Sequence, residues 1–410
     1  MAPLSLSPQT NLELKKLIDD ACSNPNVDLP YAAVVVVGRD DNGIRELFAY
    51  SSNQGDDDIL WLASCTKLVT SIACMQLVEE GSLALDDVHQ VETLCPELRD
   101  VKVVQEDGSL VDKKRGITLR MLLTHTAGFG YSFLNPKLEK YNASYDEFSG
   151  SFSDFLQPLV NQPGERFEYG ISLDWAGILV ERASGLKLND FMQRNIFLPL
   201  QIRNLTMVPS AQMKDRLAHL WQRSADGRLS RGVIPLSRAL STDPAEVADT
   251  FHSGGAGLFG SIQEYSKILA TLLNDGTCPL TGARILSPTA VAKLFTNQLP
   301  DAPNFARRHL PAVKPSLVHP SESLYPLCPP ALPQGWGFGS MISPGVTGRS
   351  DTTAHWSGLS NVFWWLDRGK GVAGVVASQV LPFVDPQAAM LWVGVERLVY
   401  RGIAHKEREA

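Results

Sequence analysis

Strand-forming sequence is concentrated at the two ends of this 410-residue chain. The β-branched run 31–37, the turn 40–43 and the returning run 45–51 predict a hairpin near the N-terminus. Four further strand-like runs lie between residues 335 and 379, whereas helical patterns dominate the long stretch between the two ends. We therefore expect an α+β fold in which strands from both ends form one antiparallel sheet.

This pattern divides the chain into two predicted domains. Residues 1–63 and 335–410 form a sheet domain flanked by helices, and residues 64–334 form a mostly helical inserted domain. The segment 299–334 contains nine prolines, so we expect an extended surface segment there rather than a regular element. A cleft between the sheet and the helical insertion is the natural place for a site.

The composition limits the classes of function. A formal net charge of -7 gives no attraction for nucleic acid or for an anionic membrane, and no apolar run approaches the length of a membrane span. The first residues lack the basic start and apolar stretch of a signal peptide. Six scattered cysteines without metal-ligand spacing favour a reducing, cytoplasmic compartment, and the sequence indicates no metal and no cofactor.

The first chemical pattern is Ser-x-x-Lys, with Ser64 and Lys67 at the start of a predicted helix over 64–80. Residues three apart on a helix lie one turn apart on the same face, so the lysine amine can reach the serine hydroxyl. A hydroxyl beside a proton acceptor is an activated nucleophile. Alone the pattern is weak, because it occurs by chance in most proteins of this size. The helix is apolar on several faces, which predicts a central, buried position.

Several other stretches strengthen this interpretation. They include Leu-Leu-Thr-His-Thr at 122–126, Tyr-Gly at 169–170, Leu-Asp-Trp-Ala-Gly at 173–177, Gly-Gly-x-Gly at 254–257 and His-Trp-Ser-Gly at 355–358. In order and spacing they resemble the serine β-lactamase-like superfamily, which includes class C β-lactamases, D,D-peptidases and related esterases. Above all they resemble fungal acyltransferases of the lovastatin-pathway type, which move a polyketide acyl group onto an alcohol.

The resemblance implies a β-lactamase/transpeptidase-like fold and a role for each of four residues. Ser64 would be the nucleophile, Lys67 its proton acceptor, and Tyr169 the phenol that acts with the lysine as general base. A free phenol titrates at about 10 and a free ammonium at about 10.4, so each needs the other to act as a base at neutral pH. The backbone N–H groups of Ser64 and Gly358 would form the oxyanion hole.

Two departures from the β-lactamase pattern point away from β-lactams and peptidoglycan peptides. Ile171 stands where Tyr-x-Asn has its asparagine, and His355 stands where Lys-Thr-Gly has its lysine. The acyltransferase type also has an arginine three residues before the serine, where this chain has Trp61. Aromatic residues near the motifs, Phe133 and Trp365 among them, would suit a large apolar substrate. The predicted substrate contacts are Trp61, Tyr131, His355, Trp356, Ser357 and Trp364.

Two residues near the motifs are interpreted as structural. His125 precedes a glycine turn and has no evident acid partner, so we expect it to brace a helix end. Cys65 follows the nucleophile but points about 100° away from it around the helix, so we expect a buried thiol.

The main hypothesis is therefore a serine acyltransferase, or transesterase, that forms an acyl-enzyme on Ser64. It would take the acyl group from a thioester, such as one on the acyl-carrier domain of a polyketide synthase, and pass it to an alcohol of a small secondary metabolite. One alternative is a carboxylic-ester hydrolase with the same Ser-Lys-Tyr site. Another is a non-hydrolytic enzyme on this fold that forms rings or isomerises its substrate.

Overall fold

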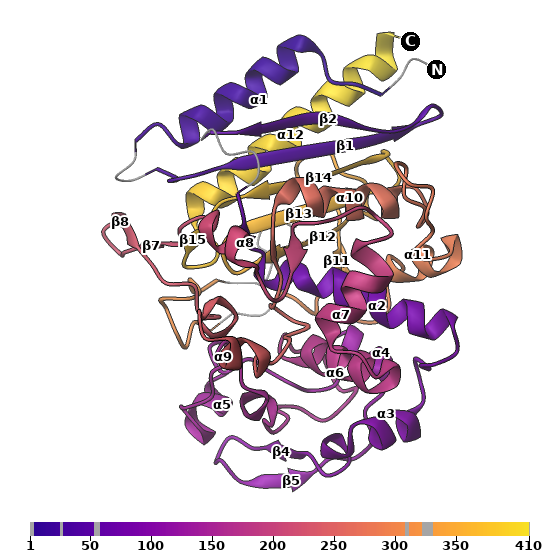
Figure 1. Cartoon of the computed structure of the whole chain (residues 1–410), viewed down its shortest axis with the longest axis vertical. Coiled ribbons are helices and arrows are strands. Elements are labelled where there is room, and N and C mark those ends of the chain that lie inside the picture. The colour runs from indigo at the N-terminus through magenta and orange to yellow at the C-terminus, as the bar shows by residue number, and fades with distance from the viewer. Residues whose placement is uncertain (1–3, 25–27, 53–57, 308–310, 322–330, 410) are drawn as a thin grey trace.

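The central feature of the fold is a seven-stranded antiparallel sheet, which fills the upper half of Figure 1. The structure is a computed structural model and describes residues 4–24, 28–52, 58–307, 311–321 and 331–409. In spatial order the strands are β10 (Gly335–Trp336), β11 (Met341–Ile342), β12 (Ala354–Gly358), β13 (Val362–Asp367), β14 (Val372–Ala377), β1 (Ala33–Asp40) and β2 (Gly43–Ser51).

The two ends of the chain meet inside this sheet. β1 pairs with β14, so that Ala33 faces Ala377 and Gly38 faces Val372, and β2 follows β1 as the edge strand of a hairpin. All of β14 and the first six residues of β1 are buried, as expected for β-branched strands covered on both faces. The α+β class and the sheet built from both ends of the sequence are thereby confirmed.

Helices from distant parts of the sequence cover the sheet. α1 (Pro8–Ala21) and α12 (Pro386–Glu409) lie side by side (Figure 1). α10 (Ile262–Leu273) packs against β1 and β14, with Leu269 and Leu272 fully buried. This helix falls within the range 64–334 that the sequence assigned to a separate helical domain. Its apolar stripe is buried on the sheet, so α10 packs with the sheet layer, and the division of the chain into two domains stays a prediction.

The helix that follows Ser64 runs between the sheet and the helical part of the chain (Figure 1). A 3₁₀ turn, Ala63–Cys65, leads into α2 (Thr66–Glu79), and every residue from Thr66 to Leu77 is buried. α2 packs against α6 (Ser172–Ser184), α7 (Leu188–Met192) and α11 (Pro288–Leu294). The predicted central, buried helix is confirmed, and its first turn contacts the sheet at β12 and β13.

Shorter elements complete the helical part. The helices are α3 (Val88–Leu94), α4 (Leu119–Leu123), α5 (Pro136–Tyr141), α8 (Ala211–Asp215) and α9 (Pro244–Ala248). Small sheets join β3 (Leu60–Trp61) with β9 (Phe259–Gly260) and β6 (Leu205–Thr206), and β15 (Val380–Leu381) with β7 (Trp221–Arg223) and β8 (Leu229–Arg231). The polar hairpin at the bottom of Figure 1 is β4 (Lys102–Val104) and β5 (Leu110–Asp112).

The proline-rich segment 299–334 is less superficial than its composition predicts. Residues 308–310 and 322–330 lie outside the described part of the chain. Phe305 packs its ring on Phe167 and Trp336, and Val318 is buried beside Phe383. The segment is therefore anchored by apolar side chains at two points. Within the described residues, no helix combines the length and the apolar character needed to cross a membrane.

Candidate active site

The backbone at Ser64 is shaped by close contact between α2 and β12. Ala63, just before the serine, has a φ of 45°, a conformation that L-residues rarely adopt. On β12, a Cβ at Gly358 would lie 2.4 Å from the carbonyl oxygen of Leu62. Glycine at position 358 therefore allows β12 to pack directly against the residues that precede Ser64.

Lys67 lies one turn after Ser64 and is completely buried. Its Nζ is 2.9 Å from Ser64 Oγ, 3.0 Å from the Tyr131 hydroxyl and 2.9 Å from the Gly255 carbonyl oxygen. These are three oxygen partners for a group that carries three N–H bonds when it is charged. The contact expected from Ser-x-x-Lys is present, and the Tyr131 and Gly255 contacts add to it.

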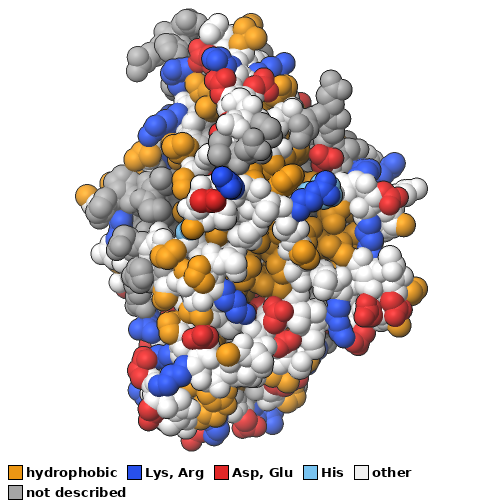
Figure 2. Space-filling model, turned by 90° about the vertical axis from the view of Figure 1, so that its left-hand side faces the viewer, with side chains coloured by type: hydrophobic (Ala, Val, Ile, Leu, Met, Phe, Trp, Pro, Cys, Tyr) orange, Lys and Arg blue, Asp and Glu red, His pale blue; other side chains and the backbone are white. Residues whose placement is uncertain are grey.

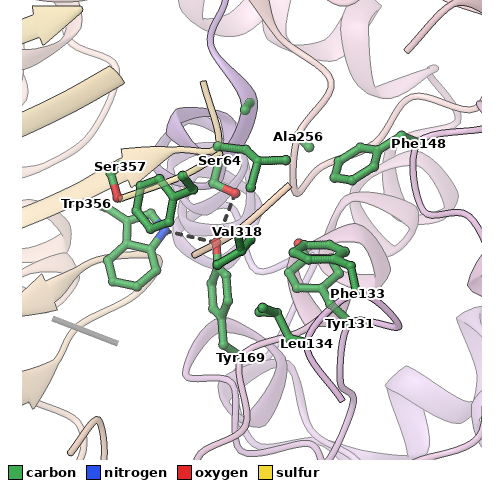
Figure 3. Close-up of a pocket in the computed structure, with 13 residues that line it drawn as sticks. Ser64, Tyr131, Phe133, Leu134, Phe148, Tyr169, Ala256, Val318, Trp356 and Ser357 are labelled. Carbon is green, nitrogen blue, oxygen red and sulfur yellow. Dashed lines mark hydrogen bonds between the residues drawn. The ribbon is translucent and has the colours of Figure 1, made fainter. Parts of the chain in front are cut away.

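Tyr169 approaches Ser64 from the other side. Its hydroxyl is 2.9 Å from Ser64 Oγ and accepts a hydrogen bond from Trp356 Nε1 at 3.1 Å (Figure 3). His125 lies behind it, with ring centroids 4.9 Å apart, and its Nδ1 accepts the Gly170 N–H at 3.4 Å. Burial, together with the charge of Lys67, lowers the pKa of His125 well below its usual range. His125 is thus a neutral brace for the turn that carries Tyr169.

Tyr131 contributes a second phenol to the site. Its ring stacks on Phe133 and meets the Tyr169 ring edge-on at 5.3 Å. Burial, with smaller contributions from Asp174 and neighbouring groups, raises the pKa of Tyr131 well above that of a free phenol. Its hydroxyl therefore stays protonated and is available as a hydrogen-bond partner of Lys67.

The predicted second donor of the oxyanion hole, Gly358, faces a different way. Burial raises the pKa of the Cys65 thiol, and the opposing contributions come from Lys67 and from the Gly358 N–H, which points at this thiol. Gly358 also pairs with Val362, so its N–H is directed toward β13. Leu359, the next residue, follows the end of β12 and lines the cavity beside Ser64. In the described part of the chain the N–H groups of Ser64 and Leu359 have no hydrogen-bond acceptor. Gly358 as the second donor stays a prediction, and the N–H of Leu359 is a second candidate for this role.

A mostly apolar cavity opens above Ser64. It encloses about 490 Å³, with its mouth included. Figure 2 shows hydrophobic side chains gathered in the middle of one face of the molecule, and Figure 3 shows the cavity residues arranged around the serine. The lining residues come from eight separate stretches of the chain: Ala63, Ser64, Tyr131, Phe133, Leu134, Phe148, Tyr169, Ala256, Val318, Trp356, Ser357, Leu359 and Phe383.

Three predicted substrate contacts lie away from this cavity. Trp61 is fully buried, and its Nε1 donates to the Ala256 carbonyl oxygen at 2.9 Å. Trp364 is fully buried in β13. His355 lies under α12, where its Nε2 is 2.9 Å from Ser343 Oγ. These three predictions are corrected. Because neighbouring residues of a strand point to opposite faces, Trp356 rather than His355 takes the position next to Tyr169.

Several cavity and network residues were missed by sequence reasoning. Leu134, Phe148, Val318 and Phe383 are ordinary apolar residues in loops, and no local pattern marks them as lining. Asp174 is buried in the first turn of α6. The signal for it was present, since an acidic residue inside the apolar run after Tyr169 requires a buried partner.

Comparisons with known proteins show the family of the chain. A family model described as Beta-lactamase matches residues 32–395. The "Lovastatin esterase" of Penicillium rubens is 35% identical over 345 residues, which cover 80% of this chain and 81% of that protein. The "Monacolin J acid methylbutanoyltransferase" of Aspergillus terreus is 33% identical over 359 residues, which cover 83% of this chain and 81% of that protein.

Solved structures also match. Unliganded simvastatin synthase from Aspergillus terreus superposes with a TM-score of 0.77 at 27% identity, covering 96% of this chain and 98% of the other. EstCE1, described as a hydrolase with promiscuous acyltransferase activity, gives a TM-score of 0.73 at 19% identity, covering 96% and 99%. The latter likeness concerns the fold alone. The β-lactamase/transpeptidase-like fold expected from the motifs is confirmed.

Proposed function

The chain belongs to the β-lactamase family, and we propose that within it the protein is a serine acyltransferase. One relative is named as a methylbutanoyltransferase and another as an esterase, and both activities share an acyl-enzyme chemistry. The observation that carries the proposal is that Ser64 Oγ lies 2.9 Å from both Lys67 Nζ and the Tyr169 hydroxyl. A hydroxyl held between two proton carriers beneath an apolar cavity suits nucleophilic attack on an acyl carbonyl.

In the first half-reaction the Ser64 oxygen attacks the carbonyl carbon of a thioester or ester. The proton of Ser64 passes to the Tyr169–Lys67 pair, and the carbonyl oxygen becomes an oxyanion that accepts the N–H groups of Ser64 and Leu359. The tetrahedral intermediate then expels the leaving group, which takes the proton from the pair and departs as a thiol or an alcohol. The acyl group remains as an ester on Ser64.

In the second half-reaction an acceptor alcohol enters in place of the leaving group. It gives its proton to the same pair, attacks the acyl carbon and forms the product ester, while Ser64 regains a proton. Trp356 assists both halves, because its N–H donates to the Tyr169 oxygen and stabilises a phenolate there.

The cavity lining defines the substrate class. No charged side chain is found among the described residues that line it, so an acyl group with a carboxylate or an ammonium would be desolvated without compensation. We therefore assign an uncharged, apolar acyl group, carried as a thioester. A polyketide-synthase carrier domain is the proposed donor, and an alcohol of a secondary metabolite is the proposed acceptor.

Hydrolysis is a second candidate, since the 35%-identical relative is named as an esterase. The same acyl-enzyme would then be attacked by water. The apolar lining favours transfer, because phenyl and aliphatic side chains around the ester hold no water in place for attack. Partition of the acyl group between water and an added alcohol separates the two activities.

The test is intact-mass spectrometry after mixing the protein with a short acyl thioester of N-acetylcysteamine. The wild type should gain one acyl group on Ser64, and Ser64→Ala should gain none. Ser357→Ala, which changes another serine on the cavity wall, is the matched control and should still be acylated. A wild type that never acylates, or a Ser64→Ala variant with unchanged turnover, would contradict the proposal. Product analysis with and without butanol then gives the partition between transfer and hydrolysis.

A further inference from the structure

Asp174, in the first turn of α6, is a buried acid for which the steps above give no role. It is 1% exposed, and its Oδ1 accepts the Ser253 hydroxyl at 2.5 Å and the Gly255 N–H at 2.9 Å. Burying a carboxylate costs free energy unless hydrogen bonds and a countercharge offset it. The two hydrogen bonds meet part of this requirement, and a nearby cation must meet the rest.

The hydrogen bonds of Asp174 fix a turn that touches the catalytic lysine. The Gly255 carbonyl oxygen accepts a hydrogen bond from Lys67 Nζ at 2.9 Å, while the N–H of the same residue is held by Asp174. On the other side, Thr70 of α2 donates its hydroxyl to the Gly254 carbonyl oxygen at 2.7 Å. The turn is therefore clamped between α6 and α2, and the direction of the Gly255 carbonyl depends on both.

The absence of a side chain at Gly255 allows this approach. A Cβ there would lie 2.5 Å from Asp174 Oδ2 and 3.0 Å from the Tyr131 hydroxyl. Asp174 and the Lys67–Tyr131 contact thus lie on either side of a single glycine. Both groups are buried, and opposite charges in the interior of a protein interact more strongly than they do in water.

Lys67 itself has no carboxylate in direct contact. None of the ion pairs among the described residues includes it, and its three hydrogen-bond partners are neutral oxygens. The other titratable groups around it are the phenols Tyr131 and Tyr169, the Cys65 thiol and the His125 ring. Burial raises the pKa of Asp174, while the charge of Lys67 acts in the opposite direction. The two buried groups therefore compensate each other's charge across the turn.

We propose that Asp174 is a positioning residue that aligns the Gly255 carbonyl with Lys67 and supplies the negative charge that keeps the Lys67 amine protonated in the resting enzyme. The inference rests on the proposed acyltransferase function. A charged Lys67 assigns the two roles in the base pair: Tyr169 takes the proton of Ser64, and Lys67, 4.8 Å from the Tyr169 ring centre, stabilises the phenolate.

The kinetic test uses Asp174→Asn, because an amide oxygen can still accept from Ser253 and Gly255 while the charge is lost. The rate of Ser64 acylation is measured from pH 5 to pH 10 by single-turnover release of p-nitrophenol from p-nitrophenyl butyrate. Removing a negative charge makes the Lys67–Tyr169 pair give up its protons more easily. The whole pH profile should therefore move to lower pH by about one unit, and the maximal rate should fall by about tenfold or more.

The matched control is Ser253→Ala, which removes one hydrogen bond to Asp174 but keeps its charge. It should lower the melting temperature and leave the position of the pH profile where it is in the wild type. An Asp174→Asn profile at the wild-type position, whatever its height, would overturn the inference, since a purely structural residue changes only the height.

A second measurement does not depend on turnover or on an Asp174 variant. In wild-type protein labelled with ¹³C at lysine Cε, the Lys67 signal at pH 7 should have the chemical shift of an ammonium, with Lys67→Arg giving its assignment. The shift of a neutral amine would overturn the countercharge. A charged Lys67 in a protein that never acylates would leave this inference standing while the proposed function fails, so the two failures are distinguishable.

Discussion

Two buried cations in this molecule are held in opposite ways. Arg349, under α12, forms a double hydrogen-bonded ion pair with Glu396, and both side chains are 1% exposed. Thr347 also donates to Glu396, at 2.6 Å. Lys67, on the other side of β12, is equally buried but touches only neutral oxygens.

The difference separates a charge that stabilises the fold from a charge that takes part in proton transfer. A guanidinium in direct contact with a carboxylate is fixed in place and does not deprotonate. An amine held by a serine, a phenol and a carbonyl can exchange its proton with the first two, and its distant countercharge biases the exchange without blocking it. The first arrangement stabilises the sheet–helix contact, and the second serves a reaction.

The largest expected effect is on activity. Lys67→Met fills the same space without a charge, so acylation of Ser64 should slow by about 1000-fold or more. The melting temperature should fall, but by less than in Arg349→Met, because Asp174 loses its countercharge while it keeps the hydrogen bonds from Ser253 and Gly255. Single-turnover acylation and calorimetry measure the two quantities. A variant that keeps its acylation rate, or one that loses as much stability as Arg349→Met, would contradict the distinction between Lys67 and Arg349.

The second prediction concerns the contribution of the Arg349–Glu396 ion pair to the free energy of unfolding. Arg349→Met leaves Glu396 buried without its partner and should cost about 3–5 kcal/mol of the free energy of unfolding. The double variant with Glu396→Leu should regain most of this loss, while the acylation rate of the folded protein stays within about twofold of the wild type. Urea unfolding of both variants gives the comparison. If the single variant were as stable as the wild type, the pair would not be structural.

The smallest expected effect is on the pH dependence of the free energy of unfolding. Burial, together with Arg349, lowers the pKa of His355 well below its usual range, and His125 is lowered by burial and Lys67. Both rings are neutral when folded but bind a proton when unfolded below about pH 6.5, so the free energy of unfolding should fall as the pH drops from there toward the folded-state pKa values. The decrease should be at most about 1.4 kcal/mol per pH unit for each ring.

His355→Gln, which keeps a polar group opposite Ser343, should remove about half of this slope and leave the share of His125. Urea unfolding between pH 5 and pH 7.5 measures it. An unchanged slope would show that His355 is not buried in its neutral form.

The sequence was most informative where contacts are local or carried by a motif. Ser64 and Lys67 meet because residues three apart share a helix face, and Tyr169 follows from its motif. On β12 the sequence predicted that His355 and Trp356 both contact the substrate. Neighbouring residues of a strand face opposite sides, so only Trp356 lies beside Tyr169, whereas His355 lies beside Ser343.

The cavity walls and the interaction of Asp174 with Lys67 could not be predicted from the sequence, for a different reason. Phe148, Val318 and Phe383 are brought together by loops that are distant along the chain, and apolar loop residues have no periodicity from which to infer a partner. Asp174 interacts with Lys67 through the backbone of a turn from a third segment. Such a relation exists only after all three segments have packed.

The pairing of β1 with β14 has a consequence for how the protein is made. Ala33 can pair with Ala377 only after the long segment between them has been synthesised, so one edge of the hairpin formed by β1 and β2 stays unpaired until then. Contacts of such long range also make folding slow and expose the nascent strand to aggregation. We expect Ser64 to reach its working geometry late, since β12, which shapes its backbone, is synthesised long after α2.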